Sequence, residues 1–404
     1  MDIIVIGGGA SGLFVSGGCA KKGYNVTLIE KNEKLGKKLY ITGKGRCNIT
    51  NCCSNDEYFL NVPTNSQFLY SCISSFTPYD TIQFFEDQGL KLKVERGNRV
   101  FPESDKSSDI IKVLQSYCLR NGVNIKLNEE VVDCYENSQT SKFVVVTTKG
   151  KYECNKLIIC TGGKSYSATG SDGFGYKVAK KFGHTIIEPV PALCPIKLKD
   201  KWVKNIEGLS LKNVKLSAFS NNKLIKSEFG EMLFTSNGIS GPIVLTISSY
   251  INRLKNVSLV LDFKPALTYE TLENRILREF EENKNSQINT VIRSLLPKNL
   301  VAIFLDYIKL PENTKVNSIT VEQRKSIING LKEFKLNFNG LYDIDYAIIT
   351  SGGVNTKEIN PKTMESKLVS NLYFAGEVID VDALTGGFNL QIALSTANSI
   401  VKEM

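Results

Sequence analysis

The first 30 residues hold the feature that most constrains the fold. The apolar run DIIVI (residues 2–6) is typical of a buried strand, and Gly7, Gly9 and Gly12 follow it with the spacing G-x-G-x-x-G. A helical stretch then leads to a second strand, NVTLIE, which ends in Glu30. Glycines at these positions allow a tight turn and close approach to a pyrophosphate, and the acid can accept from a ribose hydroxyl. The pattern predicts a dinucleotide-binding domain, in preference to a glycine turn that merely packs a helix on a strand.

The C-terminal part of the sequence favours FAD over NAD. The segment NLYFAGEVID (371–380) predicts a strand before Gly376 and Glu377, and TGGFN (385–389) leads into a last helix over 388–402. Glu377 can accept from ribityl hydroxyls, and the helix N-terminus can stabilise negative charge on a reduced flavin. A NAD dehydrogenase domain would continue with further β-α-β units instead. No second nucleotide-binding domain is visible, so NAD(P)H is expected, if at all, as a transient reductant of the flavin.

The pattern of elements changes twice along the chain, which predicts an interrupted first domain. The segment EPVPALCPI (188–196) has three prolines in seven residues, which argues against a regular element and for a boundary. Alternating apolar and polar residues then favour antiparallel strands, and helical spacing follows. We therefore predict an α/β protein with a discontinuous FAD-binding domain (1–189 and 341–404), a β-rich insert (190–267 and 335–340) and a helical subdomain (268–334).

Charge and cysteine content bear on partners and location. The formal net charge is +9, but lysines and arginines are scattered along the sequence, which argues against a nucleic-acid partner. The ten cysteines form neither a repeated C-x-x-C nor a Cys/His cluster, so no metal site is predicted. No signal peptide and no run of eighteen apolar residues is visible, so we expect a cytoplasmic protein without membrane contact. The oligomeric state is not indicated.

Five segments together resemble one family of bacterial flavoproteins. They are GGGASG, KKLYITGKGRCNITN, RVFPESDKSSDII, GEMLFTSNGISGP and YFAGEVIDVDALTGGFNLQIALSTA, and they span about Ile3 to Ala397. In this order they resemble the BaiN-like flavoproteins, which include aminoacetone oxidase and bile-acid ene reductase members. The resemblance implies an FAD-dependent oxidoreductase with a glutathione reductase-like, Rossmann-type FAD domain, a β-barrel-like insert and a small helical domain.

The resemblance also implies contacts with the cofactor. It places Ser11 and Gly12 at the pyrophosphate, Glu30 at the ribose, Val131 at the adenine, and residues 42–48 beside the isoalloxazine. The complete set of predicted cofactor-binding residues is Gly7, Gly9, Ala10, Ser11, Gly12, Glu30, Lys31, Lys38, Thr42, Gly43, Gly45, Arg46, Cys47, Asn48, Val131, Thr161, Gly162, Gly163, Gly376, Glu377, Asp382, Gly387, Phe388, Asn389 and Leu390.

The sequence does not identify the catalytic acid or base. Where the family has L-F-T-H-x-G-x-S-G-P, this chain has LFTSNGISGP, so Ser236 replaces the usual histidine. The only histidine, His184, is expected to be a junction residue between a helix and a strand. Hydride transfer needs positioning more than a protein base. If a proton is handled by a side chain, the candidates are Lys44, Arg46, Tyr166 and Ser236, with Lys44 and Arg46 expected to face the cofactor.

The segment TGKGRCNITNCC (42–53) admits two interpretations. Cys47 and Cys52 have the spacing of a flavin-linked redox disulfide. Glutathione reductase-type enzymes combine such a disulfide with a C-terminal histidine and a nicotinamide domain, and this chain has neither. We therefore favour a loop that contacts the flavin through Gly43–Asn48.

Two reactions on a small organic substrate fit this sequence. One is oxidation of an amine or a similar C–H donor by O2, and the other is NAD(P)H-driven reduction of an activated C=C bond. A third hypothesis is a tRNA-modifying flavoprotein, which the net charge of +9 and the likeness of its FAD domain to those of tRNA-modifying flavoenzymes suggest.

Overall fold

The computed structural model describes residues 1–404, which form two compact units. The terminal unit comprises Met1–Ala192 and Asp343–Met404, and the insert unit comprises Leu193–Tyr342. The two junctions therefore follow Ala192 and Tyr342, two or three residues beyond the expected boundaries after residues 189 and 340. Each unit has its own hydrophobic core.

A five-stranded parallel sheet forms the centre of the terminal unit. Its strand order is β20-β10-β1-β2-β6, and every neighbouring pair is parallel. Four of the five β1 residues are buried, as expected for a strand covered on both faces. The C-terminal β20 thus completes a sheet that begins at the N-terminus. The strands are β1 (Asp2–Ile6), β2 (Asn25–Ile29), β6 (Asn124–Lys126), β10 (Lys156–Ile159) and β20 (Leu372–Phe374).

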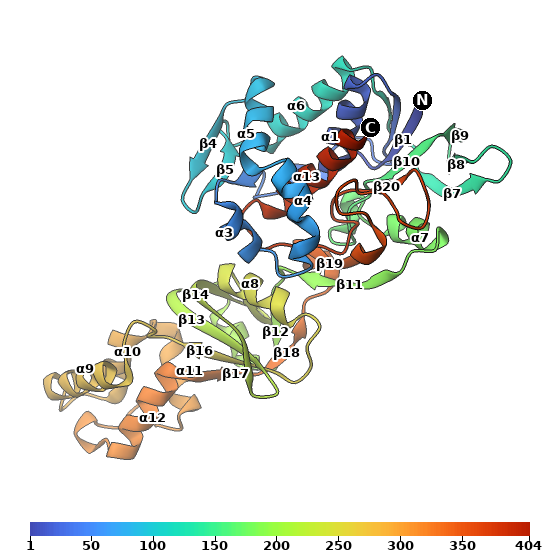
Figure 1. The fold of residues 1–404 in the computed structure, drawn as a ribbon. Coiled ribbons are helices and arrows are strands. Elements are labelled where there is room, and N and C mark those ends of the chain that lie inside the picture. Colours follow the sequence, from blue (N-terminus) through green and yellow to red (C-terminus); the bar gives the residue numbers. More distant parts are fainter. The chain divides into compact units, whose positions relative to one another are not determined.

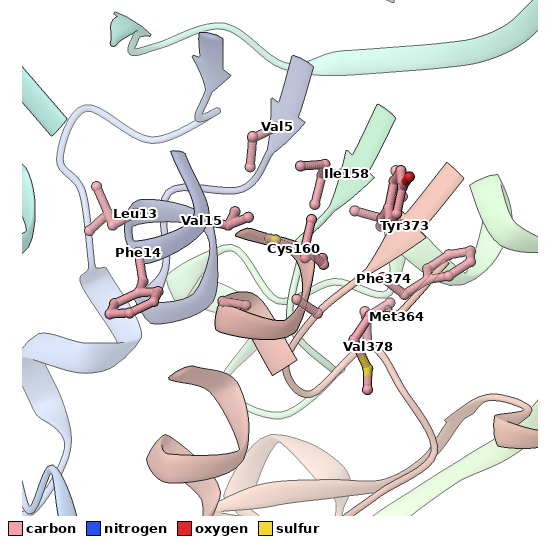
Figure 2. Packing of buried hydrophobic residues seen from close by; sticks show 14 of the residues in the cluster. Val5, Leu13, Phe14, Val15, Ile158, Cys160, Met364, Tyr373, Phe374 and Val378 are labelled. Carbon is pink, nitrogen blue, oxygen red and sulfur yellow. The ribbon is translucent and has the colours of Figure 1, made fainter. Parts of the chain in front are cut away.

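Three helices pack together beside this sheet. Helix α1 (Ala10–Lys21) contacts both α6 (Ser107–Arg120) and α13 (Phe388–Glu403), and the three lie side by side in Figure 1. A Cβ at Gly18 would lie 2.5 Å from Val401, so the missing side chain lets α1 and α13 approach closely. Figure 2 shows aliphatic side chains of α1, β1 and β10 gathered in this core.

Shorter elements surround the sheet. One three-stranded sheet has the order β3-β5-β4 and another the order β7-β8-β9. These strands are β3 (Thr50–Asn51), β4 (Leu92–Glu95), β5 (Arg99–Pro102), β7 (Val131–Asn137), β8 (Lys142–Thr147) and β9 (Lys151–Cys154). The helices are α2 (Lys37–Ile41), α3 (Asn55–Leu60), α4 (Tyr70–Ser75), α5 (Pro78–Asp87) and α7 (Phe174–Lys181).

The proline-rich segment forms a strand, which corrects the expectation that it has no regular structure. Strand β11 (Ile186–Ala192) pairs with β19 (Ile349–Val354) in a two-stranded antiparallel sheet. The register shifts between Ile187 and Val190, where Pro189 lies. Proline is tolerated here because a two-stranded sheet has only edge strands and the bulge removes a ladder hydrogen bond.

The insert unit is built on a seven-stranded antiparallel sheet. Its order is β17-β16-β13-β14-β15-β12-β18, with β17 and β18 as the edges. Its strands are β12 (Ile196–Leu198), β13 (Ser210–Ser220), β14 (Lys223–Thr235), β15 (Gly238–Ser240), β16 (Val257–Asp262), β17 (Phe334–Leu336) and β18 (Phe338–Leu341). Its helices are α8 (Pro242–Ile251), α9 (Tyr269–Glu282), α10 (Ile288–Leu295), α11 (Lys298–Tyr307) and α12 (Val321–Lys332).

The helices of the insert share one core with its sheet. Phe304 of α11 stacks on Phe334 of β17, with ring centroids 6.5 Å apart. The expected helical subdomain (268–334) is therefore packed on the strands rather than enclosing a core of its own. No helix in the chain is long and apolar enough by itself to cross a membrane. The pair α10 and α11, which is bent by 118°, meets the criteria of length and composition only when both helices are counted together.

Candidate functional site

The turn between β1 and α1 has the geometry that its glycines predicted. Gly7 has a φ of +105°, and a Cβ at Gly12 would lie 1.8 Å from the carbonyl oxygen of Gly7. Only glycine at position 12 therefore lets the helix begin this close to the strand. A Cβ at Gly9, in contrast, would meet no atom within 4 Å. The turn is thus closed on the side of Gly12 and open at Gly9.

The N-terminus of α1 carries an uncompensated positive potential. The first helical hydrogen bond runs from the Leu13 N–H to the Gly9 carbonyl oxygen at 3.0 Å, so the preceding N–H groups have no acceptor in the helix. No side chain caps this end, and its first turn has no acidic residue. Ala10 and Ser11 therefore offer backbone donors at the positive end of the helix dipole, as an anionic pyrophosphate requires.

Glu30 follows β2 and reaches back to the glycine turn. Its carboxylate accepts from the Gly8 N–H at 2.7 Å, and from the backbone N–H and side-chain amide of Asn32 at 2.9 and 2.6 Å. A carboxylate has about four acceptor sites, so these three donors fix Glu30 and leave room for one more hydroxyl. This geometry fits a ribose hydroxyl. Asn32 was not predicted, although its position two residues after the acid is typical of a side chain that closes a local turn.

The segment after β10 lies against the same glycine turn. A Cβ at Gly7 would lie 3.1 Å from the Cα of Thr161, whose buried hydroxyl has no hydrogen-bond partner. Gly162 has a φ of +72°, and Gly163 packs against Thr350 and Glu377. The segment 161–163 is therefore held next to the nucleotide turn.

Two further predicted residues have partners within the protein. Lys31 forms an ion pair with Asp172 at 2.6 Å, which ties the end of β2 to the loop before α7. Val131 is buried at the start of β7 and pairs with Thr147. The structure therefore gives Lys31 a contact within the protein, while the roles of both residues toward the cofactor remain predictions.

Glu377 and Lys38 form the centre of a half-buried polar network. The two Glu377 oxygens accept from Lys38 Nζ at 3.0 and 2.8 Å, and one of them also accepts from the Thr350 N–H at 2.8 Å. Ser165 links the pair, because its hydroxyl lies 2.7 Å from Lys38 Nζ and 3.2 Å from Glu377. Gly376, whose φ is +78°, brings this turn to Ser11 of α1. Ser165 and Thr350 were missed because they come from segments without a recognisable motif.

The loop 42–48 is a tight turn of unusual backbone conformation. Positive φ values occur at Gly43, Lys44, Gly45 and Cys47, which lie between +58° and +84°. The N–H groups of Gly45 and Cys47 both donate to the carbonyl oxygen of Thr42, at 3.2 and 3.0 Å. Gly43 and Gly45 adopt positive φ without steric cost, whereas Lys44 and Cys47 adopt it although their side chains disfavour it. The Asn48 side chain accepts from the Val100 N–H at 3.2 Å and joins the loop to β5.

Arg46 holds this loop from the side through contacts within the protein, and its contact with the cofactor remains a prediction. Its guanidinium forms ion pairs with Glu95 and Asp105, and it lies 4.2 Å from the centre of the Phe101 ring. Lys93 adds a second cation, 2.7 Å from Asp105. Hydrogen bonds from Arg46 and Lys93 hold the pKa of both carboxyls below their usual values, and those carboxylates raise the pKa of Arg46. Arg46 is therefore unsuited to proton transfer and acts as an anchor.

The N-terminus of α13 lies against the end of the same loop. A Cβ at Gly387 would lie 2.4 Å from the carbonyl oxygen of Thr50, and Asn51 donates to the Gly386 carbonyl oxygen at 3.0 Å. This helix has no side-chain cap, and its first turn has no acidic residue. Its first hydrogen bond runs from the Gln391 N–H to Gly387, so the N–H groups of 388–390 lack helical acceptors. A second positive helix end is thus built beside the loop 42–48.

Side chains behind this helix end are fixed by packing. Phe388 is buried edge-on against Tyr58, whose hydroxyl donates to the Phe388 carbonyl oxygen at 2.9 Å. The Asn389 side chain bonds both the N–H and the carbonyl of Ala383, at 2.9 and 2.7 Å. Asp382 is 1% exposed and forms a β-bridge with Thr64. Leu390 is partly buried in the core.

The other catalytic candidates are dispersed. Lys44 is exposed at the tip of the loop, and Tyr166 is exposed with a φ of +52°. Ser236 lies in the turn between β14 and β15 of the insert unit. His184 lies between α7 and β11, buried against Phe374, where burial lowers its pKa. No group of His, Cys, Asp and Glu side chains is arranged to hold a metal ion.

The cysteines of the loop are free thiols, as are all ten in the chain. Cys47 is fully buried, and burial raises its pKa well above the ordinary value. Burial also raises the pKa of Cys53 to about 11 and that of Cys52 above its usual value. Thiol–disulfide exchange requires the thiolate, which these environments disfavour. The structure therefore argues against the redox disulfide, and the contact of this loop with the flavin remains a prediction.

These features fit FAD. The open side of the turn at Gly9, the free donors of α1 and the spare acceptor of Glu30 match the adenosine and pyrophosphate part. The α13 N-terminus, the loop 42–48 and Glu377 provide donors and acceptors for the flavin part. When bound, FAD would supply the site with two-electron redox chemistry.

Comparison with known proteins agrees with this assignment. The family model of the HI0933-like protein Rossmann domain matches residues 1–402. A ribosomal RNA dihydrouridine synthase of Haemophilus influenzae is 33% identical over 98% of this chain and 96% of its own length. A protein of the same name from Escherichia coli is 30% identical over 100% and 98%, and a 3-dehydro-bile acid delta(4,6)-reductase of Clostridium scindens is 29% identical over 97% and 96%.

A solved structure shows the same fold. The 3-ketosteroid delta1-dehydrogenase of Sterolibacterium denitrificans, determined with 1,4-androstadiene-3,17-dione, aligns over 100% of this chain and 98% of its own. The TM-score is 0.52 at 11% sequence identity. The expected Rossmann-like FAD-binding fold and the resemblance to the BaiN-like flavoproteins are confirmed. This chain belongs to the HI0933-like Rossmann-domain family of FAD-dependent oxidoreductases.

Proposed function

We propose that this protein reduces a C=C bond conjugated to a carbonyl group, and that the bond belongs to a uracil base in ribosomal RNA. The observation that carries the proposal is the full-length likeness to three proteins named for reactions of one type. Dihydrouridine is uridine with its C5=C6 bond saturated, and that bond is conjugated to the C4 carbonyl. A 3-oxo compound with double bonds at positions 4 and 6 has the same conjugation.

The reaction balances with a pyridine nucleotide as reductant. A hydride adds to the carbon β to the carbonyl, a proton adds to the α carbon, and NAD(P)H with one proton becomes NAD(P)+. FAD, when bound, would supply the two-electron redox chemistry for this transfer. This chain has no separate nucleotide domain in addition to the one described, so NAD(P)H and the base are proposed to use the flavin in turn.

The protein residues would bind and orient the reactants. The donors at the N-terminus of α1 and the carboxylate of Glu30 would hold the adenosine diphosphate part. The free N–H groups of α13 would stabilise negative charge on the flavin ring, and Lys38 would hold Glu377 in place. For the proton, the terminal unit offers Lys44 and Tyr166, whose amino and phenol groups are exposed and make no hydrogen bond within the chain.

The test is a reduction assay under anaerobic conditions. The holoprotein would be reduced with NADPH and mixed with ribosomal RNA from cells that lack this gene, and dihydrouridine would be measured by mass spectrometry of nucleosides. Dihydrouridine that depends on both protein and NADPH supports the proposal. Reduction of the oxidised flavin by an amine donor and its reoxidation by O2, with no product in RNA, would support the oxidase hypothesis instead.

A small-molecule enone is a second candidate substrate, because the Clostridium scindens relative is named for reduction of a bile acid. The same reduced holoprotein would be mixed with a 3-oxo-delta4 steroid. Fast flavin reoxidation by the steroid, together with no reaction on RNA, would favour this candidate. In both cases the protein reduces a C=C bond conjugated to a carbonyl group. The two candidates differ only in whether that bond belongs to RNA or to a small molecule.

A further inference from the structure

The positive charge of the chain is concentrated in the insert unit. Residues 193–342 contain 22 Lys and Arg against 14 Asp and Glu, a net charge of +8. Residues 1–192 and 343–404 contain 28 against 27, a net charge of +1. The total of +9 therefore resides almost entirely in 150 residues that hold neither the glycine turn nor Glu30. A charge imbalance of this kind calls for an anionic partner.

The β13–β14 hairpin presents one face of this unit to solvent. Leu216 and Ala218 of β13 are fully buried, and α8 packs against the hairpin (Figure 1). Lys215 and Ser217, which flank Leu216 in the sequence, point to the other face, because side chains alternate along a strand. On that outer face, exposed Lys215 is directly opposite Phe229, which is 60% exposed. An aromatic ring exposed beside a lysine is unexplained by the packing of the insert.

Further lysines extend this face along the hairpin. Lys212 is exposed in the bulge of β13 between Leu211 and Val214. Lys223 pairs with the buried Ser220 and is exposed beside the hairpin turn, at the end of this face. Lys255 is brought to the same end of the hairpin, because its carbonyl oxygen accepts from the Ser220 hydroxyl at 2.8 Å. None of these lysines, nor Lys215, forms an ion pair with a carboxylate. Their charges are therefore available to a ligand.

Few acidic side chains oppose these lysines. The two strands carry only Glu228 and Glu231. On the other side of β13, Asp262 of β16 pairs with Lys215 but is buried and forms an ion pair with Lys332 at 2.8 Å. Glu228 is paired with Lys226 at 3.1 Å, and both lie opposite buried β13 residues, on the face that α8 covers. Glu231 is exposed opposite the bulge and is the single acid near Lys212. The outer face thus keeps a clear positive excess.

We propose that this outer face and the exposed end of the hairpin, together called the hairpin surface, bind the RNA substrate, with lysines on phosphates and Phe229 stacked on an unpaired base. It comprises Lys212, Lys215, Lys223, Lys255, Leu224 and Phe229. The inference rests on the proposed action on ribosomal RNA and adds where that RNA is held. Lysines bind phosphate as point charges, and an aromatic ring stacks on any base, so this combination is typical of binding to single-stranded RNA.

The size of the surface suits several nucleotides. Strand β14 has 13 residues, and at about 3.3 Å per residue it extends roughly 40 Å. Four phosphate contacts to a single strand give a slope of about −2.8 in a plot of log affinity against log salt. The four lysines therefore account for about 50-fold of the affinity lost between about 50 and 200 mM salt.

The test compares two variants with the same net charge. In one, Lys212, Lys215, Lys223 and Lys255 become Gln; in the control, four exposed lysines of the terminal unit, Lys91, Lys151, Lys357 and Lys362, become Gln. Binding of a fluorescein-labelled single-stranded oligouridine to each holoprotein would be measured by anisotropy over a salt series. Between about 50 and 200 mM salt, we expect the affinity of the wild type for the oligonucleotide to fall about 50-fold more than that of the hairpin variant. The control variant should retain most of the wild-type slope. Phe229→Ala should weaken binding at least about fivefold at every salt concentration.

The outcomes separate this inference from the proposed function. If the hairpin variant binds RNA with the wild-type slope while the wild type forms dihydrouridine, the hairpin surface is wrong and the function stands. If the hairpin variant loses binding but the wild type forms no dihydrouridine, the surface stands and the function fails.

Equal loss of RNA affinity in the hairpin and control variants would overturn the inference, because net charge alone would explain it. Tighter binding to phosphatidylserine vesicles than to RNA would overturn it in favour of a membrane surface. Thermal melting of both variants shows whether they are folded.

Discussion

Substitution of Gly9 by Ala should separate cofactor binding from folding. Gly9 has φ −83° and ψ −166°, which alanine adopts without strain, and its Cβ would meet no protein atom within 4 Å. The apoprotein should therefore keep its stability or gain about 0.4–1 kcal/mol, because alanine restricts the unfolded chain. The added methyl group would, however, occupy the open side of the turn, where the free N–H groups of α1 converge.

The expected loss of affinity follows from crowding at that position. Forcing a methyl group into a well-packed contact costs about 1–3 kcal/mol, which corresponds to roughly 5- to 150-fold weaker binding of FAD. The affinity would be measured by calorimetric titration of apoprotein with FAD, and the stability by thermal melting without FAD. Gly12→Ala is the matched comparison, because its Cβ would lie 1.8 Å from the Gly7 carbonyl oxygen. That variant should lose stability as well as affinity.

Two results would refute this reasoning. If Gly9→Ala binds FAD as tightly as the wild type, the pyrophosphate does not lie over the open side of the turn. If the Gly9→Ala apoprotein melts at a much lower temperature than the wild type, the turn is not as open as the structure shows. Only a stable apoprotein with weakened FAD binding agrees with the described geometry.

Three other predictions concern the surroundings of the site. A double-mutant cycle with Lys38→Met and Glu377→Gln should give a coupling of about 1 kcal/mol in the unfolding free energy of the apoprotein, since the pair is partly exposed; a coupling near zero would contradict the described network. Burial lowers the pKa of His184, so the unfolded state takes up its proton first and stability should fall as the pH drops below about 6.5. The fall should be at most about 1.4 kcal/mol per pH unit, and His184→Asn should lack this contribution; identical melting profiles of the two proteins between pH 5 and 7 would argue against it. Titration of thiols in the denatured protein should give equal counts with and without prior reduction, and a difference of two would indicate a Cys47–Cys52 disulfide.

Local geometry explains which parts of the site could be predicted from sequence. Gly7, Gly12 and Glu30 lie within one β-turn-α-β unit, where the chain itself fixes their spacing. The second helix N-terminus at Gly387 was also visible, because a glycine pair precedes a long apolar helix. These features need few long-range contacts to take their places.

The remaining features depend on contacts between distant segments. Glu95 and Asp105, which hold Arg46, come 49 and 59 residues later in the chain. The partner of Lys38 is 339 residues away. Pro189 was expected to exclude a strand, because the sequence does not show that β11 would pair at an edge with a bulge. Each of these features depends on a partner that only the fold supplies.

The charge distribution shows the same limitation at a larger scale. Along the sequence the lysines are scattered, and this argued against RNA. Division of the chain into its two units concentrates the net charge in the insert, and strand pairing places Lys215 beside Phe229. Neither the unit boundaries nor the strand register can be read from the spacing of the lysines alone.

The central claim is that the reduced protein transfers its electrons to a uracil base in RNA. The most direct measurement is a single-turnover experiment without O2, in which reduced holoprotein is freed from excess NADPH and mixed with ribosomal RNA from cells that lack the gene. We predict that the flavin absorbance returns and that one dihydrouridine is formed for each flavin oxidised. A flavin that stays reduced until air is admitted, with no dihydrouridine in the RNA, would contradict the account.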